Sequence, residues 1–194
     1  MTNVLLDCGF HYGEGLRRLS QYYEINDDWR VYAFEPNPAC ELADRAKTFR
    51  FRVRARPMAV WIYDGYIAFR QEDHTKSDSH SPEDGWTNLD GWGSCLAELN
   101  SNHRGLGEPI SVPCFDFSHF LRVNFQDGDY RIICKFDIEG AEFPVLRKML
   151  VEDTVGLLDT LYVEYHARLI PSESEASEQA LTEALRQRTN VLAW

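Results

Sequence analysis

Four groups of residues in this 194-residue chain have the types and spacing to do chemistry. The first is D-C-G-F-H-Y-G at residues 7–13, which joins a short apolar run to a helix-like segment. Glycines at such a turn let a ligand approach the backbone, and the spacing differs from the G-x-G-x-x-G turn of dinucleotide-binding folds. Asp7 would repel a pyrophosphate and suits a cationic ligand. An ordinary strand-to-helix turn has the same glycines, so this group alone leaves both interpretations open.

The second group is F-E-P-N-P at residues 34–38, where Glu35 ends another apolar run. In parallel α/β folds an acid at this place, about 20 residues after the glycine turn, binds the two ribose hydroxyls. Pro36 and Pro38 fix the loop that follows. Together with the glycine turn, Glu35 predicts nucleoside binding rather than a solvent-facing acid at a strand end.

The third group is K-F-D-I-E-G-A-E at residues 135–142. Alternation along a strand puts Lys135, Asp137 and Glu139 opposite the apolar side chains. Acids this close repel each other unless they face a cation or a polar substrate, so Asp137 and Glu139 are predicted to belong to a site. Glu142 either joins them or meets the dipole of the helix that begins there.

The fourth group is E-Y-H at residues 164–166. His166 beside an acid is either a proton acceptor or a partly buried, hydrogen-bonded histidine. Two sets of side chains also carry atoms that metals bind: Asp137, Glu139, Glu164 and His166, and then His74, Asp78 and His80. Such sets are usually solvated polar groups, and we expect no metal.

The scaffold that must position these groups alternates short apolar runs with helix-like stretches. The pattern predicts strands at residues 3–8, 31–35, 54–60, 110–114, 131–138, 161–166 and 190–194, and helices at 13–23, 38–47, 117–123, 141–150 and 173–188. A hairpin with its turn at Asp64-Gly65 is expected within residues 61–70. Strand–helix alternation predicts an α/β fold, with a parallel sheet covered on both faces.

Residues 71–109 differ from the rest, because they are polar and rich in Ser, Asp, Asn, Gly and His. A loop this long inside a compact domain is usually functional or disordered. We expect it to act as a lid or substrate loop, with a short helix near residues 96–99, inserted in a single domain that spans residues 1–194.

Composition excludes several classes of function. Hydrophobic residues make up 44% and the net charge is −11, so the chain is globular and poorly suited to nucleic acid or an anionic membrane. There is neither a secretory signal nor an apolar run near the roughly 20 residues that span a bilayer. The 5 cysteines form no C-x-x-C pair, which favours a reduced, cytoplasmic compartment.

Taken together, the four groups resemble the FkbM-type family of class I S-adenosylmethionine-dependent methyltransferases. Their order and spacing agree with the family, and S-V-P-C-F-D at residues 111–116 is similar to its intervening strand and helix start. The block at residues 135–142 is the most specific part, and the resemblance covers nearly the whole chain. It implies a Rossmann-like three-layer sandwich with a mostly parallel seven-stranded sheet, and methyl transfer to a hydroxyl of a sugar or other small molecule.

The resemblance also implies roles for residues in binding S-adenosylmethionine. Those expected to contact the cofactor are Asp7, Gly9 and Gly13 at its methionine end, Glu35 at the ribose hydroxyls, and Asn37, Ala59 and Val60 near the adenine. Asp137 and Glu139 would stand beside the transferred methyl. With His166, they are the candidates to take the proton of the acceptor.

Two features depart from the family pattern. Only one predicted strand follows the last helix, where the family has a final antiparallel pair. The sheet is then shortened at its C-terminal side, or a second copy of the chain covers the edge in a homodimer. The chain also begins almost at its first strand, so we expect substrate choice to fall on residues 71–109.

Two other functions remain open at this stage. One is a module that binds S-adenosylmethionine without turnover and acts through interaction. The other is an NAD-linked oxidoreductase, which the glycine spacing and Asp7 disfavour. The expected partner of an active enzyme is a small-molecule or glycan acceptor.

Overall fold

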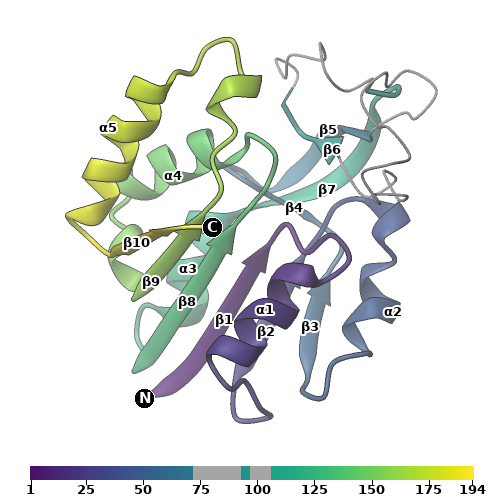
Figure 1. Cartoon of the computed structure of the whole chain (residues 1–194), viewed down its shortest axis with the longest axis vertical. Coiled ribbons are helices and arrows are strands. Elements are labelled where there is room, and N and C mark those ends of the chain that lie inside the picture. The colour runs from purple at the N-terminus through teal and green to yellow at the C-terminus, as the bar shows by residue number, and fades with distance from the viewer. Residues whose placement is uncertain (72–92, 97–105) are drawn as a thin grey trace, which may run out of the picture.

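The larger sheet of the protein consists of six parallel strands. The computed structural model describes residues 1–71, 93–96 and 106–194, and the strand order within them is β10-β9-β8-β1-β2-β3 (Figure 1). The strands are β1 (Thr2–Cys8), β2 (Arg30–Phe34), β3 (Val53–Arg56), β8 (Tyr130–Phe136), β9 (Thr160–Val163) and β10 (Asn190–Ala193). This confirms the predicted α/β class. The sheet has six strands rather than the seven that the resemblance implied, and β10 is its parallel edge strand.

Helices cover both faces of this sheet, which makes three layers. They are α1 (Glu14–Tyr22), α2 (Leu42–Ala46), α3 (Phe117–Phe125), α4 (Glu142–Val151) and α5 (Glu175–Arg186). Leu16 and Leu19 of α1 pack in one core with Leu5 of β1. Leu6, next along β1, points the other way into a core shared with α3, α4 and α5. Alternation along one buried strand therefore supplies both hydrophobic cores.

The predicted strand at residues 54–60 is two strands in different sheets. Proline lacks an N–H, so Pro57 cannot donate a ladder hydrogen bond, and β3 ends just before it. The chain then enters a second, four-stranded sheet, whose order is β4-β7-β5-β6. Its strands are β4 (Ala59–Trp61), β5 (Gly65–Gln71), β6 (Gly93–Ser94) and β7 (Ile110–Asp116).

The predicted hairpin at Asp64-Gly65 is wrong. The strands β4 and β5 that flank this turn do not pair, because β7 lies between them, parallel to β4 and antiparallel to β5. Val112 and Cys114 of β7 are buried against Ala59 and Phe69. Burial of these apolar side chains explains why the distant strand takes the central place.

Other boundaries move by a few residues. The helix predicted at 38–47 is a 3₁₀ helix, η1 (Pro38–Cys40), followed by α2, with Glu41 in the left-handed region between them. The strand β8 ends at Phe136, so Asp137 and Glu139 lie in the loop beyond it. Two other 3₁₀ helices are η6 (Val155–Leu157) and η7 (Ala167–Leu169). Most of the predicted insertion at 71–109, including nearly all of its expected helix, lies outside the described residues.

None of the described helices combines the length and apolar character needed to cross a bilayer. The predicted dimer contact at a sheet edge stays a prediction. For the function, the important feature is that β1, β2, β8 and β9 run in one direction. Parallel strands present their carboxyl ends at one edge of the sheet, where ligands of such folds bind.

Candidate active site

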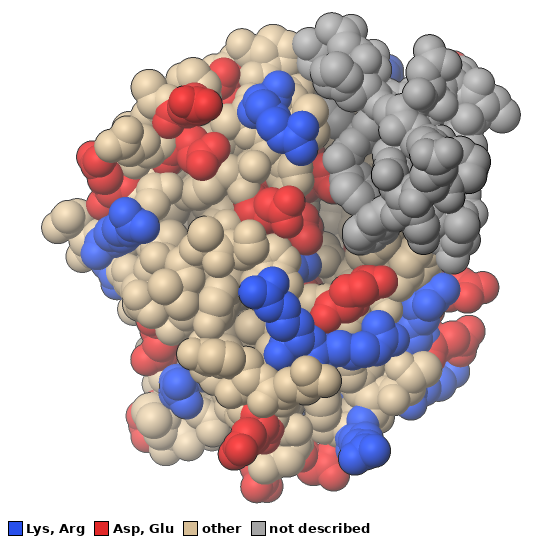
Figure 2. Space-filling model, in the orientation of Figure 1, with Lys and Arg blue, Asp and Glu red and all other residues tan. Residues whose placement is uncertain are grey.

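A cavity of about 410 Å³ opens at the carboxyl ends of the parallel strands. A volume in this range suits a small-molecule ligand. Its walls include six residues that the sequence predicted for a site: Gly9, Glu35, Ala59, Val60, Asp137 and Glu139. In Figure 2, a hollow near the centre of the face has acidic side chains above it and a band of basic side chains below it.

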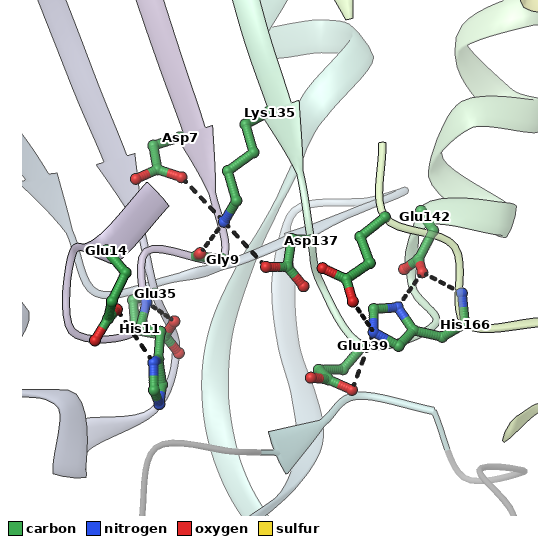
Figure 3. A network of polar contacts seen from close by, with 11 residues as sticks. Asp7, Gly9, His11, Glu14, Glu35, Lys135, Asp137, Glu139, Glu142 and His166 are labelled. Carbon is green, nitrogen blue, oxygen red and sulfur yellow. Dashed lines mark hydrogen bonds and ion pairs between the residues drawn. The ribbon is translucent and has the colours of Figure 1, made fainter. Parts of the chain in front are cut away.

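Glu35, the first residue after β2, holds its carboxylate in place with backbone donors. Its Oε2 accepts a hydrogen bond from the N–H of His11 at 2.8 Å (Figure 3), and its Oε1 accepts one from the N–H of Asn37 at 2.9 Å. Burial raises the pKa of Glu35 to about 7, although these two donors favour the charged form. Each oxygen keeps a further lone pair that can accept a ligand hydroxyl.

Gly9 is required by the close approach of two strand ends. Its φ is +82°, and a Cβ at this position would lie 1.7 Å from the carbonyl oxygen of Asp137. Only glycine fits both conditions. The ends of β1 and β8 thus meet at the floor of the cavity, and Asp137 is fixed beside the glycine turn.

Lys135 is a buried cation that joins the two strand ends. Its Nζ donates to the carbonyl of Gly9 at 2.6 Å and lies 3.3 Å from carboxylate oxygens of both Asp7 and Asp137 (Figure 3). Burial disfavours the ammonium, but the two carboxylates outweigh this effect and raise the pKa of Lys135 above its ordinary value. Asp7 is itself fully buried, and burial raises the pKa of its carboxyl against the effect of Lys135.

A second buried ion pair lies at the other end of the site, between Glu142 and His166. Nδ1 of His166 lies 2.6 Å from Oε1 of Glu142, and the other oxygen of Glu142 accepts from the N–H of Gly140 at 2.7 Å. The opposite ring nitrogen, Nε2, lies 3.5 Å from the carboxylate of Glu139. Burial disfavours the imidazolium, but Glu142 and Glu139 together raise the pKa of His166 to about 9. His166 is therefore charged at neutral pH and donates from both nitrogens.

One end of the cavity is apolar. Ala59, Val60, Phe34 and Phe69 line it, and each is nearly inaccessible to solvent. Phe34 directly precedes Glu35 at the end of β2, and Glu35 lines the same cavity. An aromatic base attached to a ribose at Glu35 would find an apolar wall here.

These features agree with a comparison against known families. The family model described as "Methyltransferase FkbM domain" matches residues 7–189 of the chain. The chain belongs to this FkbM methyltransferase family. Neither a curated protein nor a solved structure matches the chain.

Members of the FkbM family use S-adenosylmethionine as the methyl donor, and the cavity fits this cofactor. Glu35 offers a preorganised acceptor for ribose hydroxyls, the apolar end suits the adenine, and Asp137 stands where a positive sulfonium would be favoured. Glycine at position 9 lets the backbone of Asp137 approach the turn after β1, which brings Asp137 to the cavity. The acids and the apolar wall face one cavity, which is the arrangement that a cationic nucleoside needs.

Four of the predicted site residues lie behind the cavity wall. Asp7 pairs with Lys135, and Gly13 has φ +86° and packs on the ring of Phe10. Asn37 caps η1, since its side chain accepts from the N–H of Ala39. His166 pairs with Glu139, since its Nε2 lies 3.5 Å from the Glu139 carboxylate. Their roles toward the cofactor remain predictions.

The structure also brings residues to the cavity that the sequence did not assign to it: His11, Arg18, Lys135 and Trp194. Lys135 stands inside the most specific block, and the repulsion expected among its acids was a sign that a cation must be near. Trp194 is the last residue of the chain, and Arg18 lies on α1. Nothing in their sequence neighbourhood indicated that either would lie at the cavity.

Asp137, Glu139 and His166 each offer one metal-ligand atom, and these atoms lie within 4.8 Å of one another. The same groups also pair with one another, since Nε2 of His166 lies 3.5 Å from the carboxylate of Glu139.

Proposed function

We propose that the chain methylates a hydroxyl group of a sugar, a glycan or another small molecule. The observation that carries this proposal is that two acids, each next to a buried cation, face the same cavity as Glu35. Asp137 lies beside Lys135, and Glu139 lies beside His166. Their side chains are 26% and 17% exposed, so both are accessible to a substrate.

S-adenosylmethionine supplies an electrophilic methyl group when it is bound. The task of the chain is to align an acceptor with that methyl and to exclude water. Glu35 and the apolar end would fix the nucleoside, which leaves the wall with Asp137 and Glu139 for the acceptor. Hydroxyls donate well to carboxylates, so these acids suit a polyhydroxyl compound.

A hydroxyl must lose its proton as its oxygen bonds to carbon, so a nearby base is needed. With a pKa of about 9, His166 is already protonated at neutral pH and cannot take this proton. We therefore assign proton acceptance to Asp137 or Glu139. His166 acts as a positioning residue that holds the carboxylate of Glu139.

Three described residues of the predicted insertion support its role in selecting the acceptor. Gly93 and Cys95 line the cavity, and the hydroxyl of Ser94 donates to the carbonyl of Glu139 at 2.7 Å. The described residues 93–95 thus contact the loop that carries both acids. This contact is what a substrate loop would require.

Turnover on a panel of acceptors tests the proposal. Release of S-adenosylhomocysteine is measured with sugars, glycans, small alcohols and, as a contrast, amines. We expect turnover on hydroxyl compounds and a loss of about 100-fold or more in either Asp137→Asn or Glu139→Gln, with S-adenosylhomocysteine binding retained. Asp44→Asn, which alters an exposed acid outside the cavity, is the matched control.

Turnover on amines alone would contradict the hydroxyl assignment. Binding of S-adenosylhomocysteine with no turnover on any compound would instead support the binding module. Full activity in both acid variants would refute the assigned proton acceptors.

A further inference from the structure

The described walls of the cavity contain two permanent cations, Lys135 and Arg18. Lys135 already lies against three acceptor groups of the protein. An ammonium has three N–H groups, and the Nζ of Lys135 already faces the carbonyl of Gly9 and the carboxylates of Asp7 and Asp137. Its side chain is also only 3% exposed.

Arg18 is in the opposite situation. It is exposed on α1, and its guanidinium lies 4.8 Å from the centre of the Trp194 ring. Within the described chain, this guanidinium makes neither an ion pair nor a hydrogen bond. The acid one turn earlier, Glu14, lies 3.4 Å from Nδ1 of His11 instead. Arg18 thus presents its N–H donors at the cavity with no carboxylate to receive them.

Trp194 is fixed in its place below the guanidinium. Its backbone N–H donates to the carbonyl of Val163 at 3.0 Å, and its ring packs against the ring of Tyr162 with 5.8 Å between the ring centres. Stacking on an aromatic face orients a guanidinium and leaves its edge free for an anion. The band of basic side chains below the hollow in Figure 2 lies on the same side as α1 in Figure 1.

The sheet order indicates which part of the cofactor reaches this place. Glu35 follows β2, and Ala59 and Val60 come shortly after β3, the neighbour of β2 on the side away from β1. A nucleoside bound there has its remaining part directed across β1 toward β8, where Arg18 lines the cavity. In S-adenosylmethionine that part is the amino acid, with one ammonium and one carboxylate.

We propose that Arg18, held on the ring of Trp194, binds the methionine carboxylate of the cofactor. Glu164 on the same cavity wall suits the ammonium, and Arg18 is the cation with donors to spare for the carboxylate. This inference rests on S-adenosylmethionine binding at Glu35.

Two ligands that differ only in the amino-acid part test the inference. S-adenosylhomocysteine carries the amino acid with its carboxylate, whereas 5′-methylthioadenosine has the same thionucleoside with a methyl group in place of the whole amino-acid chain. Calorimetry is done with the wild-type chain and with Arg18→Met, which keeps an unbranched side chain over Trp194. We expect the variant to bind S-adenosylhomocysteine about tenfold more weakly and 5′-methylthioadenosine unchanged.

The neighbouring Arg17→Met is the matched control, since Arg17 is equally exposed on α1 but stacks on Phe49 and donates to the carbonyl of Tyr12. It should leave both affinities unchanged. Equal affinity of Arg18→Met and the wild type for S-adenosylhomocysteine would overturn the role of Arg18 and leave the proposed function intact. An equal loss for both ligands would also overturn it, because the effect would then be structural. No binding of either ligand by the wild type would refute the proposed function as well.

Discussion

The two ends of the cavity hold their acids in different ways. Glu35 has no ion pair in the described structure and is fixed by two backbone N–H groups. Asp137 and Glu139, at the other end, each lie beside a buried cation. The difference suits two tasks. A single carboxylate near its pKa can bind neutral hydroxyls, whereas the reacting end needs charges that stay fixed while the acceptor is aligned.

Both ends of the cavity have a non-glycine residue whose backbone lies in the left-handed region. His11, with φ +50°, directs its N–H at Glu35, and Glu139 itself has φ +53°. Each such residue costs of order 1 kcal/mol or more. The backbone geometry at both ends of the cavity therefore lowers the stability of the folded chain.

Removal of the cation at the reacting end should have the largest effect. Lys135→Met leaves Asp7 fully buried without a partner, and we expect a loss of about 3–5 kcal/mol in the free energy of unfolding by urea at pH 7. The double variant with Asp7→Asn should recover part of the loss. Lys47→Met, which breaks an exposed ion pair, should cost less than about 1 kcal/mol. A Lys135→Met variant as stable as Lys47→Met would show that Lys135 does not stabilise the buried carboxylate of Asp7.

The other cation, His166, makes the free energy of unfolding depend on pH. The pKa of His166 rises from 6.5 to about 9 on folding, so its stabilisation is complete below pH 6.5 and is lost as the pH rises through 9. The loss is about 3 kcal/mol over this window. In His166→Gln, the free energy of unfolding by urea, measured at pH 6, 7.5 and 9, should no longer show this decrease.

The same slope in the variant and the wild type would show that His166 is not the group responsible. Glu142→Gln provides a second check, since removal of the main partner lowers the pKa of His166. It should shift the loss of stability to lower pH.

The smallest effect concerns the binding end. Glu35 is mostly neutral below its pKa of about 7, and the charged form accepts hydroxyl donors better. The affinity for S-adenosylhomocysteine should rise about tenfold between pH 5.5 and 7 and level off about one pH unit above the pKa. In Glu35→Gln this part of the profile should be flat. A variant that keeps the rise would assign it to another group, such as His11.

The sequence predicted the parallel sheet and most of the acids on the cavity wall, because both depend on local patterns. Buried strands are short apolar runs, and acids that follow them lie at the carboxyl edge of a parallel sheet. The pairing of β7 between β4 and β5 could not be predicted in this way. It depends on contacts between segments about 40 residues or more apart in the sequence, such as Phe69 and Val112.

The same distinction applies to the site. Alternation placed Lys135 with Asp137 and Glu139, but whether Asp7 would face the ligand or a lysine depends on the register of β1 against β8. Arg18 and Trp194 are joined only by the folded chain, with α1 and the end of β10 side by side. Helical or strand periodicity within either segment carries no information about such a contact.

A crystal structure of the chain with S-adenosylhomocysteine tests the central claim most directly. We expect both ribose hydroxyls within hydrogen-bond distance of Glu35, the adenine against Val60, and the sulfur on the side of Asp137. A ribose bound away from Glu35, or a ligand outside this cavity, would contradict the account.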